Sequence, residues 1–339
     1  MIESYNFEEL KNNYLDKGEI VPEKWVTYMC MKLIELLNSE ENILLLQSPI
    51  VVCGDVHGQY EDVRELFRTA DVEDEEGNFD IKKKQFLFLG DYVDRGNFSL
   101  NTFLLLAGLK LEEKDRYHLL RGNHECRQVT TQYGFYNEMM QNYGTAVLYN
   151  LVMEVFDLLP FCAIIDNEIF STHGGLSPYM RYAGLLMNEE RRNEIPNAGI
   201  LADLTWSDPD DQIKQWRPNT RGAGFLFGKS QTREFCQNNG VKLVLRSHQL
   251  ANQGYQWFFT NSKDDEKNDE SKDRIEFEKP LGDLLLVWSA PNYAYRSGNV
   301  ATILEINEED SKKCVLKVFQ PAANRIDTRG KTSNSPYFT

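Results

Sequence analysis

The 339-residue chain has no closely paired cysteines, no long apolar run and few histidines. Its six cysteines are scattered without a C-x-x-C spacing, so the sequence indicates neither a disulfide framework nor a zinc ribbon and favours a reducing compartment. Apolar residues never form a run of about 18, and the first residues lack a basic segment followed by an apolar one. We therefore expect a cytoplasmic or nuclear protein that has no membrane partner.

Basic residues are in the minority, because 37 Lys and Arg stand against 52 Asp and Glu and the formal net charge is −15. Such a charge disfavours electrostatic binding to nucleic-acid phosphates, so we expect no nucleic-acid partner. Acidic residues concentrate in residues 71–80 and 261–280, and charge-dense stretches of this kind are typical of solvated surface loops. Hydrophobic residues make up 41% of the chain, which is enough for a sizeable core.

Strand and helix patterns alternate in the first half of the chain. Residues 7–47 have helix-like apolar spacing, with Pro22 at the start of a second helix, and form a predicted helical cap. Short apolar runs that end in Gly- or Asp-containing turns predict strands, and helical patterns lie between them. The expected elements are strands within 49–55, 85–91 and 116–123 and helices over 60–70 and 99–111. This order is typical of parallel βαβ units.

Strands become closely spaced beyond residue 160. They are expected within residues 161–166, 168–175, 241–249, 283–291, 300–306 and 313–320. We interpret them as a second sheet that packs on the first within one domain.

The first candidate functional segment is Gly54-Asp55-Val56-His57-Gly58, at the end of a predicted strand. Open α/β sheets place their active sites at such strand ends. In an extended segment, Asp55 and His57 point to the same side, and both are metal-ligand types. Alone, such a pair is more often a turn aspartate beside an incidental histidine than a metal site.

A second strand ends in Gly90-Asp91-Tyr92-Val93-Asp94-Arg95. It adds two carboxylates and an arginine suited to bidentate capture of a phosphate. Alone, this segment could be a Gly-Asp turn with an internal ion pair between Asp94 and Arg95.

The remaining candidates are histidines that also follow predicted strands. Asn123 and His124 follow the third strand, and His173 and His248 end later apolar runs. Either of the last two could be a hydrogen-bonded strand residue, but four of the five histidines occupy such strand ends. His118 is the exception and is read as an ordinary strand histidine.

Together these carboxylates, imidazoles and one carboxamide, without a thiolate, suit two metal ions such as manganese, iron or zinc. Asp91 is the candidate bridge between the two ions. Arg95 and Arg221 would neutralise phosphoryl oxygens, while His124, oriented by Asp94, would protonate the leaving oxygen.

Several motifs resemble those of a known family. GDVHGQ (54–59), GDYVDRG (90–96) and RGNHE (121–125) are similar to the signature of the PPP family of serine/threonine protein phosphatases. Five further segments resemble its 2A-type group, which includes types 2A, 4 and 6. They are RQVTTQYGFY (127–136), HGGLSP (173–178), WSDPD (206–210), RGAGFLFG (221–228) and SAPNYAYRSGN (289–299).

The resemblance implies a single-domain α/β metallophosphoesterase fold of the calcineurin-like kind, a β-sandwich flanked by helices. The catalytic domain would span residues 1–320, with charged loop insertions near 71–84 and 261–280, and residues 321–339 would form a flexible tail. The implied metal ligands are Asp55, His57, Asp91, Asn123, His173 and His248. His124 with Asp94 would be catalytic, and Arg95, Arg221 and Tyr293 would contact phosphate or substrate; the role of Tyr293 rests on the resemblance alone.

The implied function is hydrolysis of phosphoserine and phosphothreonine in proteins by direct attack of a metal-bridging hydroxide. Two metal ions would be the cofactors, with manganese expected in vitro and iron or zinc as alternatives. The expected partners are phosphoprotein substrates and the scaffold and regulatory subunits of a 2A-type holoenzyme. Two alternatives stay open: another two-metal phosphoesterase, such as a nucleotide phosphodiesterase or a nuclease, and an inactive interaction module.

Two positions depart from the family pattern. The chain ends Tyr337-Phe338-Thr339 where the 2A group usually has Tyr-Phe-Leu with a methylated leucine, so the resemblance does not carry methylation-dependent assembly over to this chain. In addition, SAPNY is commonly followed by cysteine, and this chain has Ala294.

We predict that cyclic peptide toxins that attach covalently to that cysteine bind this chain only reversibly, because Ala294 has no nucleophilic sulfur. Intact-mass spectrometry after incubation with such a toxin should show the unmodified mass. A covalent adduct would contradict the prediction.

Overall fold

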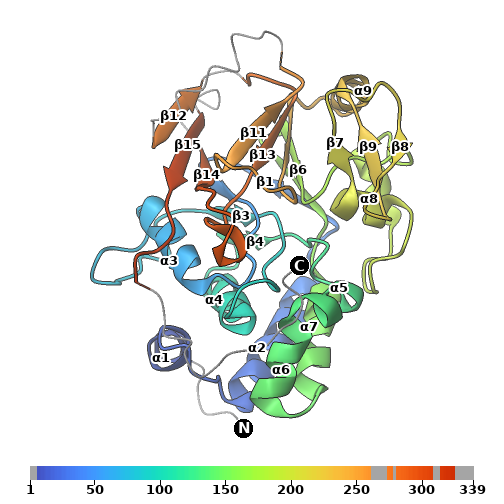
Figure 1. The fold of residues 1–339 in the computed structure, drawn as a ribbon. Helices are drawn as coiled ribbons and strands as arrows, with labels where there is room; N and C mark the ends of the chain where they lie inside the picture. Colours follow the sequence, from blue (N-terminus) through green and yellow to red (C-terminus); the bar gives the residue numbers. More distant parts are fainter. Residues whose placement is uncertain (1–5, 261–272, 278–279, 308–313, 325–339) are drawn as a thin grey trace.

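Two mixed sheets lie face to face in the computed structural model, which describes residues 6–260, 273–277, 280–307 and 314–324 (Figure 1). The first sheet consists, in spatial order, of β12 (Arg274–Phe277), β15 (Cys314–Phe319), β14 (Ala301–Ile306), β2 (Ile50–Cys53), β3 (Phe86–Phe88) and β4 (Tyr117–Leu119). The second consists of β1 (Ile43–Leu46), β5 (Cys162–Ile165), β6 (Ile169–Thr172), β10 (Leu243–Arg246), β13 (Leu284–Val287) and β11 (Tyr255–Phe258). A small third sheet joins β7 (Asp208–Pro209), β9 (Phe225–Phe227) and β8 (Arg217–Pro218).

Alternation along the strands explains why the two sheets pack on each other. In β2, Ile50 and Val52 face the layer between the sheets, while Val51 and Cys53 face the helices. Every residue of β2 is buried, so the strand is apolar on both faces instead of alternating with polar residues. The same pattern in β3, β10 and β13 gives one apolar layer between the sheets and one on each outer face.

Helices cover the outer faces of the sandwich. The helices on the outer side of the first sheet share one apolar cluster with it: α1 (Phe7–Leu10), η1 (Lys11–Leu15), α2 (Glu23–Leu37), α3 (Tyr60–Thr69), α4 (Ser99–Glu112), α6 (Phe135–Tyr143) and α7 (Val147–Asp157). α3 and α4 contact the strands, α1, η1, α2 and α6 pack on α4, and α7 packs on α2 and α6. Against the second sheet lie η2 (Ala183–Asn188), α8 (Ile200–Trp206) and α9 (Lys229–Asn239). Two further short elements are α5 (Arg127–Tyr133) and η4 (Tyr293–Tyr295). The predicted α/β sandwich flanked by helices in one domain is thereby confirmed.

The parallel part of each sheet sets where a site can form. β2, β3 and β4 run parallel, with α3 and α4 as the predicted crossovers between them. β6, β10 and β13 are parallel in the second sheet. Each group therefore gathers its carboxyl ends at one edge of its sheet.

Three details of the sequence prediction are wrong. Residues 43–46, which belong to the predicted helical cap 7–47, form the strand β1 instead. This strand pairs with β5 and buries three of its four residues. The last two predicted strands do not join the second sheet: β14 pairs antiparallel to β2 and extends the first sheet together with β15. Arg274–Phe277 lies inside a stretch predicted as a loop, yet it pairs with β15 as β12.

The acidic segment 71–80 is only partly a solvated loop. Glu73 is buried, and its carboxylate binds Arg64 through Nε at 2.5 Å and Nη2 at 2.6 Å. Arg68 contributes a further bond of 2.7 Å to the same carboxylate. Residues 261–272 and 278–279 of the predicted charged loop lie outside the described residues, and so do residues 325–339 of the predicted tail 321–339.

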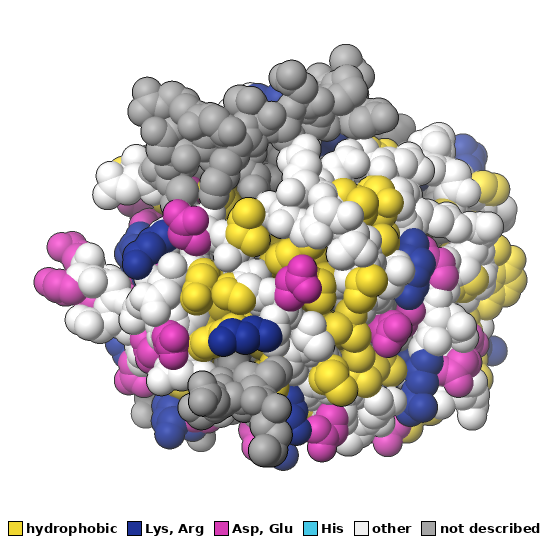
Figure 2. Space-filling view, turned by 90° about the horizontal axis from the view of Figure 1, so that it is seen from below, with side chains coloured by type: hydrophobic (Ala, Val, Ile, Leu, Met, Phe, Trp, Pro, Cys, Tyr) yellow, Lys and Arg dark blue, Asp and Glu magenta, His cyan; other side chains and the backbone are white. Residues whose placement is uncertain are grey.

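The described residues include neither a membrane-spanning helix nor an exposed histidine. Among the described residues, no helix is both long and apolar enough to cross a membrane. On the face drawn in Figure 2, hydrophobic side chains are interspersed with acidic and basic ones, and no histidine is visible. All five histidines are in fact buried.

His118 is a buried histidine outside the strand ends and predicts an acid-sensitive contribution to stability. It lies in β4, where Gln85 Nε2 donates to His118 Nε2 at 3.3 Å, and burial together with Lys110 lowers its pKa to about 4. A histidine that titrates at 6.5 when unfolded then stabilises the fold above pH 6.5 and loses this contribution as the pH falls towards 4. His118→Gln should therefore lose less stability than the wild type between pH 7 and pH 5, by about 2 kcal/mol.

Urea unfolding at both pH values measures this difference. An equal loss of unfolding free energy in His118→Gln and the wild type would contradict the assignment of His118 as a buried neutral imidazole.

Candidate metal centre

The predicted metal ligands follow the carboxyl ends of parallel strands in both sheets. Asp55 follows β2, Asp91 follows β3 and Asn123 follows β4. His173 comes directly after β6, and His248 comes two residues after β10. All five are buried, so residues nearly 200 positions apart meet at one edge of the sandwich.

Backbone carbonyls decide which ring nitrogens face this edge. His57 Nδ1 lies 2.9 Å from the carbonyl of Val93, and His173 Nδ1 lies 3.1 Å from that of Leu89. A carbonyl can only accept, so both Nδ1 atoms carry the proton. The Nε2 atom of each ring therefore faces the site, where it can bind a proton or, in place of that proton, a metal cation.

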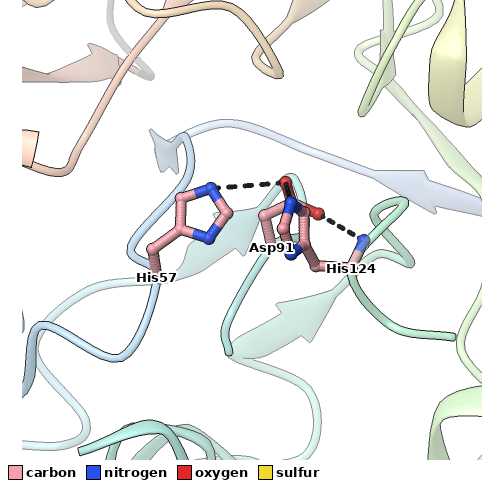
Figure 3. Close-up of side chains that lie close together, drawn as sticks. All are labelled: His57, Asp91 and His124. Atoms are coloured by element: carbon pink, nitrogen blue, oxygen red, sulfur yellow. Dashed lines mark hydrogen bonds and ion pairs between the residues drawn. The ribbon is translucent and has the colours of Figure 1, made fainter. Parts of the chain in front are cut away.

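Around Asp91, several electron-rich atoms converge. His173 Nε2 lies 2.9 Å from Asn123 Oδ1, 3.2 Å from His248 Nδ1 and 3.4 Å from Asp91 Oδ1. His57 Nε2 lies 3.5 Å from Asp91 Oδ2, the second oxygen of this carboxylate (Figure 3). Lone pairs at these distances repel one another unless a cation or a proton lies among them.

The pKa values of the imidazoles show how strongly the site favours positive charge. Burial by itself would lower the pKa of His57, but the carboxylates of Asp55 and Asp91 overcome it and raise the pKa to about 9. The same two carboxylates raise the pKa of His173 against its burial. Burial lowers the pKa of His248 well below its usual range, which keeps that ring neutral.

Asp91 is held as a carboxylate. Burial would raise its pKa, but the imidazoles of His173 and His124 outweigh burial and keep the pKa well below the usual range. A field that draws protons onto two imidazoles also draws metal cations, which replace those protons on binding.

The donor set fits two metal ions that share one carboxylate. Two groups of ligand atoms lie within 4.8 Å of one another: His57, Asp91 and His124, and Asp91, His173 and His248. Asp91 belongs to both, as expected of a bridge. Among the described residues, Asp55 Oδ2 and His248 Nε2 are buried without a hydrogen-bond partner, which leaves two more donor atoms available. Nitrogen and oxygen donors without a thiolate suit manganese, iron or zinc.

His124 is anchored in the manner of an oriented acid or base. Its Nδ1 lies 2.7 Å from Asp94 Oδ2, while Phe135 N donates to Asp94 Oδ1 at 2.8 Å. Asp94 is fully buried and thus fixes the ring orientation. His124 Nε2 remains directed at the site, 3.9 Å from Asp91 Oδ2.

The three predicted substrate-contacting residues border the same edge. The Tyr293 ring centroid lies 5.1 Å from that of His57. The guanidinium of Arg95 lies 4.0 Å above the Tyr133 ring, whose centroid is 5.5 Å from that of His124. Arg221 is held by Asp208, its Nε bonding to Oδ2 at 2.6 Å.

Sequence reasoning assigned no role to two buried acids inside the recognised motifs. Glu125 accepts hydrogen bonds from the backbone N–H groups of Asp91, Tyr92 and Gly122 at 2.7, 2.8 and 2.9 Å. It therefore ties the end of β3 to the end of β4. Its place beside His124 in RGNHE was the available signal.

Asp208 is the second such acid. Besides Arg221, it binds Arg246 Nη2 at 2.8 Å, and it lies 4.0 Å from His248 Nε2. Burial would raise its pKa, but His248, Arg246 and Arg221 hold the pKa far below the usual range. The WSDPD motif contains this residue, but nothing in its spacing shows that Asp208 meets an arginine from β10.

Comparisons with known proteins match most of the chain. The family model for calcineurin-like phosphoesterases matches residues 48–252. The structure is similar to that of a protein serine/threonine phosphatase from Saccharomyces cerevisiae with similarity to human phosphatase PP5. The TM-score is 0.78 at 28% identity, over 94% of this chain and 96% of that one. It also resembles the cold-active protein-tyrosine phosphatase of a psychrophilic Shewanella species, with a TM-score of 0.55 at 16% identity over 82% and 83% of the two chains. At that identity, the second likeness shows the fold alone.

The shared position of Asp91 predicts how metal content responds to substitution. Asp91→Asn should lower binding at both positions, because it replaces the carboxylate common to the two groups with a neutral carboxamide that offers a single oxygen, whereas His248→Ala should affect mainly one. Metal analysis of manganese-loaded protein after desalting should give about two ions for the wild type, fewer than one for Asp91→Asn and about one for His248→Ala.

His118→Gln is the matched control, since this histidine lies in β4 outside both groups, and it should retain the wild-type content. Full metal content in Asp91→Asn would rule out a shared carboxylate.

Proposed function

Because the chain belongs to the calcineurin-like phosphoesterase family, we propose that this metal-dependent phosphoesterase is a protein serine/threonine phosphatase of the PPP family. The observation that carries the proposal is the anchored pair His124–Asp94 beside the shared carboxylate of Asp91, with Arg95 and Arg221 at the same edge. The sequence identity of 28% over nearly the full length of a yeast serine/threonine phosphatase supports this substrate class.

The finer assignment to the 2A-type group rests on the motifs at residues 127–136, 173–178, 206–210, 221–228 and 289–299. By this proposal the chain is a catalytic subunit that binds scaffold and regulatory subunits. Phosphoproteins are its substrates.

Asp55, His57, Asp91, Asn123, His173 and His248 would hold the metal ions, which when bound would supply Lewis-acid polarisation of the phosphoryl oxygens and a nucleophile at neutral pH. The chain's own residues then have two tasks. They must place the phosphoryl group at the edge of the sandwich, and they must supply a proton to the serine or threonine oxygen that leaves.

Positioning of the phosphoryl group falls to the two arginines. Asp208 binds Arg221 through Nε and so leaves the terminal guanidinium nitrogens available to phosphoryl oxygens. The Nε of Arg95 is buried and has no hydrogen-bond partner among the described residues, while its guanidinium rests on Tyr133. A preorganised guanidinium loses little conformational entropy when it binds an anion. These cations let a chain of net charge −15 hold a dianionic group.

Protonation of the leaving oxygen falls to His124. Its Nδ1 proton is shared with Asp94 Oδ2 at 2.7 Å, so the proton that can be transferred is the one on Nε2. The Asp94 carboxylate stabilises the imidazolium before transfer and keeps the ring aimed at the substrate.

Substitution of His124 tests both the reaction and the role of this residue. With manganese present, His124→Asn should reduce kcat on a phosphothreonine peptide by about 10²–10⁴-fold, because the leaving oxygen then departs without a proton donor. Its metal content should equal that of the wild type if His124 acts as the acid and not as a ligand.

The outcomes separate the alternatives. Equal activity of His124→Asn and the wild type would reject the proposed acid. Wild-type activity on nucleotide diesters but not on phosphopeptides would favour a phosphodiesterase or nuclease. Inactivity on both substrates with two bound metals would favour an interaction module.

A further inference from the structure

The loop that carries Tyr293 has an unfavourable backbone conformation. Asn292, Ala294 and Tyr295 have φ values of 42°, 51° and 61°, all in the left-handed region, and none of them is glycine. Such conformations persist only where surrounding contacts enforce them. The contacts that hold this loop therefore determine where the Tyr293 ring lies.

The side chain of Gln59 holds the loop on both sides of Tyr293. Ala294 N donates to Gln59 Oε1 at 3.1 Å, and Gln59 Nε2 donates to the carbonyl of Pro291 at 2.8 Å. Gln59 is fully buried, so these bonds are shielded from water. Asn299 also holds the loop, but it comes from the same segment, whereas Gln59 comes from 235 positions away.

Gln59 connects this loop to the metal centre. It lies two residues after His57 and directly before α3. The Tyr293 ring lies 5.1 Å from the His57 ring and 5.0 Å from the Trp288 ring. A change at Gln59 can therefore shift Tyr293 relative to His57 without altering a metal ligand.

Asp62 fixes the orientation of the Gln59 amide. Gln59 Nε2 also donates to Asp62 Oδ2 at 2.7 Å, and Ala322 N donates to Asp62 Oδ1 at 2.8 Å. The carboxylate is thus held from two directions, and the amide of Gln59 cannot turn over without losing bonds to both Asp62 and Pro291.

We propose that Gln59 is a positioning residue that sets the place of Tyr293 over the metal centre and thereby governs substrate binding. The role in substrate binding rests on the proposed phosphatase function; the role in holding the loop does not. Because Gln59 has no hydrogen bond to His124 or Asp94 among the described contacts, the effect falls on KM and not on proton transfer.

Gln59→Met tests this role in the full-length chain, because methionine fills the space of glutamine without its amide. Hydrogen–deuterium exchange in the peptide containing residues 291–296 should become at least about tenfold faster, since the Ala294 amide loses its acceptor. KM for a phosphothreonine peptide should rise about five- to tenfold, with kcat within about twofold of the wild type. Asp62→Ala should produce a smaller change of the same kind.

Asn42→Leu is the matched control. Asn42 is also a buried carboxamide that donates to two backbone carbonyls, those of Leu186 and Glu189, each at 2.7 Å, but it lies outside the site. It should lower the melting temperature without changing exchange in residues 291–296 or KM.

Unchanged exchange and KM in Gln59→Met would overturn the proposal. Faster exchange in residues 291–296 and a raised KM in Asn42→Leu would also overturn it, because both effects would then reflect general destabilisation. If the wild type fails to dephosphorylate the peptide, the proposed function fails. The exchange measurement still decides whether Gln59 holds the loop.

Discussion

Mutual repulsion among the lone pairs around Asp91 is the constraint on which the rest of the structure depends. In this buried space, neighbouring imidazole nitrogens, a carboxamide oxygen and the two carboxylate oxygens of Asp91 make contacts of 2.9–3.5 Å. Such an arrangement is unfavourable unless protons or metal cations lie among the donors, so the surrounding fold must hold the donors in place. Backbone carbonyls hold His57 and His173 through Nδ1. Glu125 holds the turn that bears Asp91 through two backbone N–H groups and ties it to the N–H group of Gly122.

The two-sheet architecture provides the rigidity that this requires. Both sheets present the carboxyl ends of three parallel strands, and the apolar layer between them fixes one edge against the other. Several site residues, among them His57, Asp91 and His248, have positive φ, as does the loop around Tyr293. Strained backbone at a site is maintained by the packing of the elements around it, and here the strands beneath it are completely buried.

Much of the fold was accessible from the sequence because its signals are local. Apolar runs ending in Gly-Asp turns located β2 and β3, and the spacing of apolar residues located α3 and α4. The errors concern pairing partners. Ile43–Leu46 became a strand because β5 lies beside it, and Arg274–Phe277 pairs with β15 despite a charged sequence. Neither partner can be read from the segment itself, since strand propensity depends on neighbours.

The sequence by itself determined the chemical types at the strand ends: carboxylates, imidazoles, a carboxamide and arginines, each next to a turn that exposes it to a sheet edge. Only the tertiary structure decided which side chains bond to one another. Asp208 binds both Arg221 and Arg246, and Gln59 binds the backbone on both sides of Tyr293. The physical reason is that turn chemistry acts over a few residues. A contact across 235 positions depends instead on the order of strands in two sheets and on the packing between them.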